Sequence, residues 1–561
     1  MDMIDENIKR EIRMFALDNA VKHGGKASYK AVVGKILGAH PELKKNVKDL
    51  IPIIKEICEE INSLSVEEQK TLLQEMGLPK KEKKEEEKTL EDLPNVEGEV
   101  RMRLAPSPSG PMHIGQSRMA ILNDEYVKRY GGILYLRIED TNPHNILPEA
   151  YDMLVEDCEW LGVDVHRIVI QSERIPLYYD IARKLIEMGK GYVCTCEPEK
   201  WRELKSKGIA CEHREDSVEN NLERWDRMLE GHYSDGEAVM VVKTDLNHPN
   251  PAIRDWIAFR IITDVEHPRT GSKYSVYPLM NIAVAVDDHY LDLTHVLRGK
   301  DHLNNTYRQM YIYDYFGWKK PVYIHYGWVM IKDAILKTSI IKEGIRSGKY
   351  SGWDDVRLAT IRALAKRGIR PEAIRKYWIN VGLKEVDIEF SWDILYSYNR
   401  EIIDPIAKRY FFVWEPVEFV YRGPEISCSA PYHPSRREMG YREYTIKDGD
   451  KIYLTKDDVE KVGQKIFRLK DLCNARIEGN EIIYEGNDLK KIKEIGGKII
   501  HWVPPQKLDC RVYMPDGKVM KGFVEKLIEN EVDGNTVQFE RFGFARIEKS
   551  EGKIIGYYTH R

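Results

Sequence analysis

The 561-residue chain has few cysteines, no long apolar run and no large excess of charge of one sign. Eight cysteines are too few to suggest a disulfide scaffold, and three of them fall between residues 194 and 211. No apolar run reaches the roughly 18 residues that a membrane-spanning helix needs. The first residues, MDMIDENIKREIRMF, are charged throughout, unlike a signal peptide. We therefore expect a cytoplasmic protein that does not contact a membrane.

The charge balance excludes little. The 87 basic and 91 acidic residues leave a net charge of −4. A protein that binds a nucleic acid on one face can show the same balance, so near-neutrality does not exclude RNA. The chain is too long for a single hydrophobic core, and we expect about two to four domains.

The first part of the chain is predicted to be helical. Residues 1–78 contain two stretches with apolar residues at helical spacing, which indicates a helical N-terminal extension. Between these stretches lie basic residues around two adjacent glycines: Lys22, His23, Lys26, Lys30 and Lys35. They fit either the solvated face of a helical bundle or an accessory RNA-contacting surface. Residues 79–96, rich in Lys and Glu, have almost nothing to bury and are predicted to be a charged linker.

The central part alternates strand and helix patterns. Over residues 97–325 this order predicts a mainly parallel sheet with helices on both faces, a Rossmann-type α/β domain. Ligands of such sheets bind at the carboxyl ends of the strands, so the loop after Leu104 and the residues after Arg137 are expected to share one site. Residues 326–404 return to helical periodicity. Residues 405–561 show short strands with turn signals, which is typical of β-barrels.

The stretch LAPSPSGPMHIGQ, from Leu104, crowds small residues before a predicted helix. His113 and Gln116 are three residues apart and share one face of its first turn. Free N–H groups and the helix dipole favour an anion such as phosphate there. Gly110 and Gly115 would let a flat or charged ligand approach the backbone closely. The alternative is a tight connection with no ligand.

Two further segments place charge at predicted strand ends. Glu139 follows the strand YLRI and could hold the ammonium group of a substrate. The run from Tyr277 is predicted to be an apolar strand that ends in the acidic pair Asp287–Asp288. Arg298 is expected at the end of the next strand, where it could pair with a carboxylate in a two-pronged geometry. The alternative is a salt bridge from Arg298 to this acidic pair.

Two clusters suggest binding of phosphate and of metal. Lys337, Ser339 and Lys342 are predicted on a mobile loop, where their side chains suit handling of a triphosphate. Separately, the chain contains two close pairs of metal-binding residue types, Cys194/Cys196 and Cys211/His213. Two such pairs on separate turns can close a tetrahedral zinc site, and four filled positions favour a structural metal.

Together these segments resemble the class I aminoacyl-tRNA synthetases, and within them the glutamyl/glutaminyl group in its archaeal or eukaryotic form. The resemblance covers nearly the whole chain from about residue 20 and rests on HIGQ, RIEDTNP, VDDH, KTSI, GKYSGWDDVRLATIRALAKRG and RFGFARIE. It implies a reaction in which ATP and Mg²⁺ activate an amino acid as an adenylate, which is then transferred to tRNA. It also implies an acceptor-stem-binding, zinc-containing insertion at about 192–275, a stem-contact region at 326–404 and anticodon-binding barrels after 405.

The resemblance also implies the amino acid. The form APSPSG, and Arg298 at the position that pairs with a side-chain carboxylate, favour glutamate over glutamine. By the same matching, Arg103, Ala105 and Ser107 line the amino-acid pocket. Glu139 takes the α-ammonium group, and Tyr277 and Asn281 lie near the substrate. The expected partners of a monomer are L-glutamate, ATP and tRNA(Glu), while charging of tRNA(Gln) stays open. A glutaminyl enzyme and a non-catalytic tRNA-binding relative are the alternatives.

Two departures from the family pattern concern the phosphate site. Gln116 stands where the second His of the HIGH element is usual, and Ile340 stands where the loop usually has a lysine. Lys337 or Lys342 must then supply the positive charge. In the barrels, Arg409 and Arg541 are interleaved with aromatic residues: Tyr410, Phe411, Trp414 and Phe542. These rings could stack on unpaired bases, but for most of them barrel core is the better interpretation.

Overall fold

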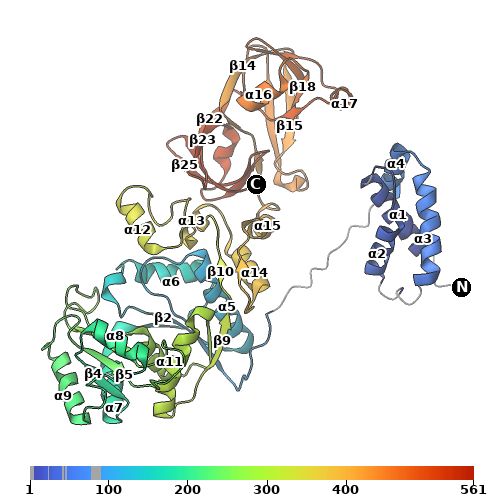
Figure 1. Cartoon of the computed structure of the whole chain (residues 1–561). Helices are drawn as coiled ribbons and strands as arrows, with labels where there is room; N and C mark the ends of the chain where they lie inside the picture. Colours follow the sequence, from blue (N-terminus) through green and yellow to red (C-terminus); the bar gives the residue numbers. More distant parts are fainter. Residues whose placement is uncertain (1–5, 23, 41–42, 44–46, 77–89) are drawn as a thin grey trace. The chain divides into compact units, whose positions relative to one another are not determined.

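The computed structural model describes residues 6–22, 24–40, 43, 47–76 and 90–561 (Figure 1). The chain divides into two compact units, residues 1–87 and 88–561. The predicted surface residue His23 and most of the charged linker lie outside the described residues. Among the helices that are described, none combines the length and the apolar character needed to cross a bilayer.

The first unit is a set of amphipathic helices: α1 (Glu6–Lys22), α2 (Tyr29–Ala39), α3 (Val47–Asn62) and α4 (Val66–Met76). Their buried residues recur every three or four positions, and they share one small core that includes Ile12, Leu17, Val32, Ile36, Leu50 and Ile54. Lys26 and Lys30 are exposed, and Lys35 pairs with Asp18 at 2.7 Å. An RNA-contacting surface on this unit stays a prediction.

The first described residues of the second unit pack into its hydrophobic core. Leu90 and Leu93 are buried against the cluster that also contains Leu104 and Leu136. The expectation that the linker has nothing to bury is therefore wrong for its last residues. Two leucines among charged residues are a weak pattern, and only the apolar surface that they meet reveals their role.

A parallel sheet supports the functional site, as expected. The strands β1 (Val100–Leu104), β2 (Gly132–Ile138) and β3 (Arg167–Ile170) pair in that order. Helix α5 (Ile114–Tyr130) connects the first two strands. Beside them, β8 (His295–Gly299) pairs in parallel with β9 (Val322–Tyr326). The N–H of Thr294, just before β8, donates to the carbonyl oxygen of Arg101 at 3.0 Å, so β8 lies next to β1.

Two elements differ from the sequence prediction. Residues Met280–Tyr290 form helix α10 rather than a strand, and the strand before it, β7 (Val276–Pro278), is short. A continuous apolar run that is buried on all sides has no period that separates helix from strand. The predicted loop around Ser339 is also helical, because α12 (Thr338–Arg346) packs Ile341 against Tyr350. Lys337 is the N-cap residue, immediately before this helix.

The remaining helices and the insertion surround this sheet. The insertion is an antiparallel sheet of β4 (Gly191–Cys194), β5 (Val239–Val242), β6 (Trp256–Ile261) and β7. Other helices are α6 (Ala150–Trp160), α7 (Ile175–Glu187), α8 (Pro198–Lys207), α9 (Val218–Leu229), α11 (Leu303–Phe316), α13 (Ile361–Lys366), α14 (Pro371–Val381) and α15 (Trp392–Ile403). A two-stranded parallel pair joins β10 (Val329–Met330) to β11 (Ile388–Glu389).

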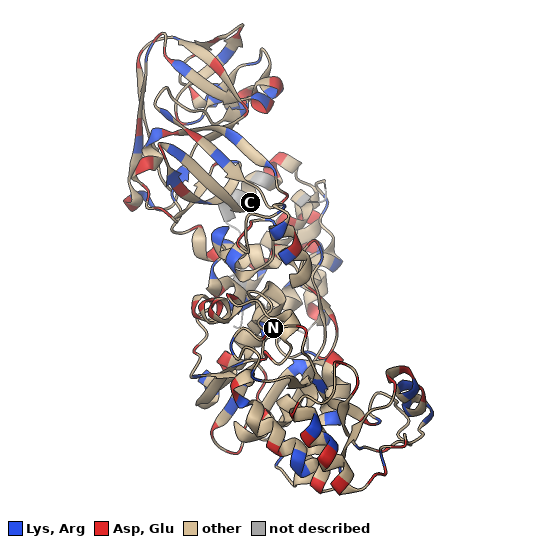
Figure 2. Cartoon of the chain, turned by 90° about the vertical axis from the view of Figure 1, so that its left-hand side faces the viewer, with Lys and Arg blue, Asp and Glu red and all other residues tan. Residues whose placement is uncertain are grey.

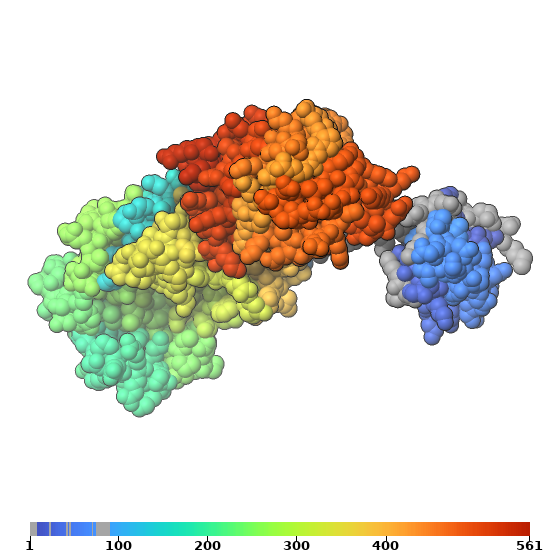
Figure 3. Space-filling view, turned by 90° about the horizontal axis from the view of Figure 1, so that it is seen from above, coloured from blue at the N-terminus to red at the C-terminus, as the bar shows by residue number. Residues whose placement is uncertain are grey.

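The C-terminal part consists mainly of two curled sheets, as predicted, and it appears as one orange-to-red body in Figure 3. One sheet has the order β12 (Arg409–Tyr410), β24 (Thr536–Phe539), β25 (Gly543–Ser550), β26 (Lys553–His560), β22 (Lys507–Tyr513), β23 (Val519–Glu525) and β13 (Phe412–Trp414). The other has the order β17 (Lys451–Thr455), β14 (Pro416–Arg422), β20 (Glu481–Tyr484), β19 (Asn474–Glu478), β18 (Phe467–Leu469) and β21 (Ile499–Ile500). The hairpin β15 (Ile426–Pro431) with β16 (Tyr441–Ile446), and the helices α16 (Lys456–Val462) and α17 (Leu489–Glu494), complete this part.

The aromatic residues singled out in the C-terminal barrels fall into a buried group and a half-buried group. Tyr410 and Phe411 are fully buried and belong to the core. Trp414 and Phe542 are half-buried and pack on each other with their ring centres 5.2 Å apart. Arg541 is engaged with both carboxylate oxygens of Asp458. Acidic and basic residues are interspersed along the ribbon in Figure 2, which agrees with the near-neutral composition.

Candidate functional site

A cleft of about 420 Å³ lies at the carboxyl ends of β1, β2 and β8. Seven of the predicted site residues line it: Arg103, Ala105, His113, Gly115, Gln116, Glu139 and Arg298. Parallel strands end at one edge of a sheet, so residues that are far apart in sequence meet there. The cleft has two chemically different ends, one at the first turn of α5 and one at a group of buried arginines.

The first turn of α5 is closed by a reciprocal pair of hydrogen bonds. The N–H of Gly115 donates to His113 Nδ1, and the N–H of His113 donates to Gln116 Oε1, both at 3.1 Å. This is a capping box in which His and Gln take the usual roles of Ser and Glu. Because Nδ1 accepts, the imidazole proton is on Nε2. Burial lowers the pKa of His113 to about 4, so the ring is neutral at pH 7.

These bonds explain what a glutamine does at position 116. Its side-chain oxygen holds the turn, and its NH₂ group remains as a donor. A neutral His113 likewise offers a donor without a charge. The first turn of α5 therefore supplies hydrogen bonds and the positive end of a helix dipole. Arg118, one turn further along α5, also lines the cleft, but its Nη1 and Nη2 donate to backbone carbonyl oxygens, so we look for a free positive charge on another element.

That element is the start of α12. Leu336 lines the cleft, and the next residue, Lys337, begins α12 with no side-chain cap on the helix. Lys337 is exposed and makes no ion pair with any described residue. The first turn of α12 lies against Gly110, where an added Cβ would stand 2.7 Å from Thr338 Cγ2. Gly110 is therefore needed for the close approach of α12 and does not line the cleft.

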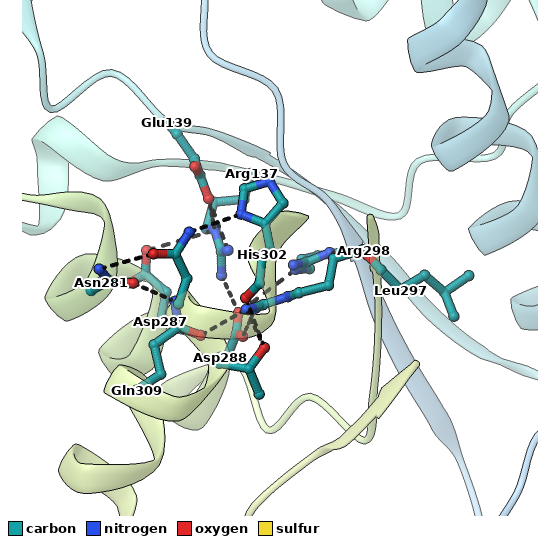
Figure 4. A network of polar contacts seen from close by, with 12 residues as sticks. Arg137, Glu139, Asn281, Asp287, Asp288, Leu297, Arg298, His302 and Gln309 are labelled. Carbon is teal, nitrogen blue, oxygen red and sulfur yellow. Dashed lines mark hydrogen bonds and ion pairs between the residues drawn. The ribbon is translucent and has the colours of Figure 1, made fainter. Parts of the chain in front are cut away.

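At the other end of the cleft, a fully buried arginine joins two carboxylates (Figure 4). Arg137 donates from Nη1 to Asp288 Oδ1 at 2.5 Å and from Nη2 to Glu139 Oε1 at 3.0 Å. Burial by itself would lower the pKa of Arg137, but these two carboxylates raise it above its ordinary value. Glu139 stays partly exposed to the cleft.

Two more arginines flank Asp288. Arg103 Nε and Arg298 Nη2 lie 3.8 Å from its two carboxylate oxygens. Arg298 Nη1 also donates to Thr306 Oγ1 at 3.1 Å and to Gln309 Oε1 at 3.0 Å. Burial lowers the pKa of Arg103 to about 10. Arg103 Nε and Asp288 Oδ2 are buried and make no hydrogen bond within the described part of the chain.

The charges at this end do not cancel. Three arginines, Arg103, Arg137 and Arg298, face two carboxylates, Asp288 and Glu139. The neighbouring Asp287 lies 4.0 Å from Arg137 Nε, but its nearer cation is Arg174, whose Nε donates to it at 2.6 Å, and Gln171 and Tyr178 donate to it as well. The alternative of an Arg298–Asp288 ion pair is thus realised, but at a longer distance than a hydrogen bond. Among these buried groups one positive charge remains for an anionic ligand, and the further carboxylate that lines the cleft, Asp301, is exposed to solvent.

A second site lies in the insertion. The ligand atoms of Cys194, Cys196, Cys211 and His213 all lie within 4.8 Å of one another. Cys194 Sγ is 3.8 Å from Cys211 Sγ, and Cys196 Sγ is 3.3 Å from His213 Nδ1. Bonds of about 2.0–2.3 Å to one tetrahedral ion require separations of this size. Thr195 Oγ1 lies 3.0 Å from His213 Nε2 and leaves Nδ1 free for a metal. The cluster is compatible with a structural zinc.

Sequence comparison agrees with this geometry. Residues 99–405 match the family "tRNA synthetases class I (E and Q), catalytic domain". The chain belongs to the class I tRNA synthetases of the E and Q group. Residues 407–493 and 499–548 match the two anti-codon binding domains of the same group.

Curated relatives match the synthetase over nearly its full length. A glutamate–tRNA ligase of Thermoplasma volcanium is 50% identical over 557 residues, which cover 98% of this chain and all of that protein. A glutamate–tRNA ligase of Methanocaldococcus jannaschii is 49% identical over 562 residues, with 99% and 100% covered. A third, of Pyrococcus abyssi, is 50% identical over 571 residues, with the same coverage.

Several residues predicted for the site of this synthetase lie outside the cleft. Ser107 is exposed, and Tyr277 is buried with its ring stacked on His267. Asn281 is linked to the site indirectly, since its side-chain oxygen accepts from Gln309 Nε2 at 3.3 Å. Ser339 and Lys342 are exposed on α12 beyond Lys337.

Two residues that organise the cleft were not predicted as site residues. Arg118 is buried, lines the cleft and donates to the carbonyl oxygens of Gly327 and Gly382. Asp288 was considered only as an alternative partner of Arg298, yet it contacts all three arginines. An arginine on the inner face of a helix, and a carboxylate in an apolar run, are the sequence signals for such residues, because neither is buried without partners.

Proposed function

We propose that this synthetase ligates L-glutamate to tRNA(Glu) through a glutamyl-adenylate, releasing AMP and pyrophosphate. The uncompensated positive charge at the arginine end of the cleft is the observation that carries this proposal. Glutamate has a net charge of −1 and would neutralise it, whereas glutamine is neutral. The names of the curated relatives support the same amino acid.

In this proposal the substrate spans the two ends of the cleft. Glu139 receives the α-ammonium group, and Arg298, with Arg103 beside it, pairs with the side-chain carboxylate. Glutamine would leave the excess positive charge of this buried cluster without a counter-charge, which costs more than a missing contact. The α-carboxylate is then directed toward the first turn of α5.

The nucleotide occupies the α5 end. Class I tRNA synthetases use ATP with Mg²⁺, and the ion supplies charge neutralisation on the phosphates. His113 Nε2–H and the Gln116 amide donate to phosphate oxygens, and Lys337 adds a positive charge where pyrophosphate leaves. A carboxylate oxygen attacks the α-phosphorus, so no side chain has to move a proton, and alignment and charge stabilisation are the catalytic contributions.

We assign the lysine role to Lys337 rather than Lys342. Lys337 follows a cleft-lining residue directly and stands at the free N-terminus of α12. Lys342 is five positions further along, beyond the first turn of the helix. The same proposal assigns 192–275 to the tRNA acceptor stem, 326–404 to the stem and 405–561 to the anticodon.

A two-by-two aminoacylation assay tests this function. Purified protein is incubated with tRNA(Glu) or tRNA(Gln) and with glutamate or glutamine. We expect charging of tRNA(Glu) with glutamate, and the assay also decides whether tRNA(Gln) is glutamylated. Charging with glutamine alone would establish the glutaminyl alternative, and no charging of any kind would leave a non-catalytic tRNA-binding protein.

We also propose that the cluster of three cysteines and His213 binds a structural Zn²⁺. We expect about one zinc per chain in the purified protein, and Cys211→Ser should remove most of it and lower the unfolding temperature, because a structural metal contributes folding free energy. Metal analysis and thermal unfolding measure both effects. Cys428→Ser, at a half-buried thiol outside the cluster, is the matched control. Equal zinc contents in Cys211→Ser and wild type would exclude the site.

A further inference from the structure

The short helix α13 begins at the turn that presents His113. The backbone N–H of Ile114 donates to Ala359 O at 2.9 Å, and that of Ile361 donates to Met112 O at 2.8 Å. His113 and Thr360 form an antiparallel bridge between these bonds. Residues 112–114 are therefore held on one side by residues 359–361, which lead directly into α13 with Thr360 as its N-cap.

The other end of α13 is fixed to the C-terminal barrel. Arg367, which ends the helix, is buried and donates from Nε to Tyr558 O at 3.1 Å and from Nη2 to Thr559 O at 2.8 Å. The Thr559 hydroxyl donates in return to Arg367 O. The next residue, Gly368, has a φ of +86°, and an added Cβ would lie 2.9 Å from Thr536 Oγ1. Two structural parts that are distant in sequence thus meet closely at this helix end.

The connection between these two ends is short and stiff. Six helical residues span about 9 Å at 1.5 Å per residue. Ala363 and Leu364 are fully buried, so the helix is packed along its length. Figure 1 shows α13 between α5 and the strands of the barrel. Strand β26, which receives Arg367, lies beyond residue 548, where the match to the anti-codon binding domains ends.

We propose that α13 is a rigid link through which the last strand of the barrel fixes the position of His113. Arg367 is then a positioning residue for adenylate formation, although it does not line the cleft. The expected effect of Arg367 on the rate of adenylate formation rests on the proposed function. The structural part of the inference, the dependence of the His113 turn on the barrel contact, stands independently of any activity.

The structural part is tested by hydrogen exchange in the full-length protein. Arg367→Lys keeps the charge but cannot donate to two carbonyl groups in a fixed fork, and it also loses the bond to the Tyr396 hydroxyl. We expect the amides of Ile114 and Ile361 to exchange at least about tenfold faster, while those of β2 are unchanged. Thr559→Val removes one bond from the same contact and should show a smaller effect at the same amides. Arg400→Lys is the control, since the exposed Arg400 side chain makes no hydrogen bond within the described part of the chain.

The catalytic part is tested by glutamate-dependent pyrophosphate exchange with tRNA(Glu) present, at a temperature where all variants are folded. Arg367→Lys should lower kcat at least fivefold and leave the KM for glutamate within twofold of wild type. An unchanged kcat in Arg367→Lys would overturn the proposal. Amide hydrogen exchange that accelerates in β2 as much as at Ile114 and Ile361 would overturn it too. If wild type shows no exchange with glutamate, the proposed function fails, and the hydrogen-exchange result still decides whether the link exists.

Discussion

Lys337→Met should lower the kcat of glutamate-dependent pyrophosphate exchange by about 100- to 1,000-fold, the range found when one preorganised transition-state donor is removed. Negative charge builds up on the departing pyrophosphate, and the first turn of α5 offers only neutral donors. His113 is uncharged and Gln116 is an amide, so the ammonium group of Lys337 is the positive side chain assigned to this position. Methionine keeps the apolar length of the side chain and removes only the charge.

The control for this substitution is Lys342→Met in the same helix. Both lysines are exposed, and neither makes an ion pair with a described residue, so their loss should affect stability equally little. We expect Lys342→Met to retain at least half of the wild-type rate, and both variants to keep the wild-type KM for glutamate. A larger loss of kcat in Lys342→Met than in Lys337→Met would transfer the role to Lys342.

Arg298→Gln should lower kcat/KM for glutamate by about 150- to 5,000-fold, because removing one partner of a buried charge pair costs about 3–5 kcal/mol. The substitution reduces the positive charges at this end of the cleft from three to two, which then equal the two carboxylates. Glutamate would enter a neutral pocket and lose its partner. Glutamine should lose far less, so the preference for glutamate is expected to collapse.

Arg101→Gln provides the matched control for this prediction. Arg101 lies on β1, two residues before Arg103, but it is partly exposed and pairs with Glu99 outside the cleft. We expect its glutamate kinetics to be within about twofold of wild type. Pyrophosphate exchange with each amino acid measures both variants. If Arg298→Gln kept wild-type selectivity, the charge balance would not be the basis of specificity.

The sequence predicts much of the fold where the pattern is local. The helix after HIGQ, the parallel strands on either side of it and the close pairs of cysteine and histidine follow from spacing alone. The sequence pattern did not predict helix α10, because the residues from Ile282 to Val286 are all apolar and buried and so show no helical period. The pattern did not predict the start of α12 either. Its apolar residues pack against Tyr350, a contact that forms only in the tertiary structure.

The sequence by itself determined the family resemblance, the order of the structural parts and seven of the residues that line the cleft. Only the tertiary structure decided the net charge at the arginine end of the cleft. Asp287 and Asp288 are adjacent on α10, yet one pairs with Arg174 and the other lies among the three arginines at the end of the cleft. The contact from Arg137 to Asp288 joins residues 151 positions apart. A charge balance is a sum over neighbours in space, and spacing along the chain cannot supply that sum.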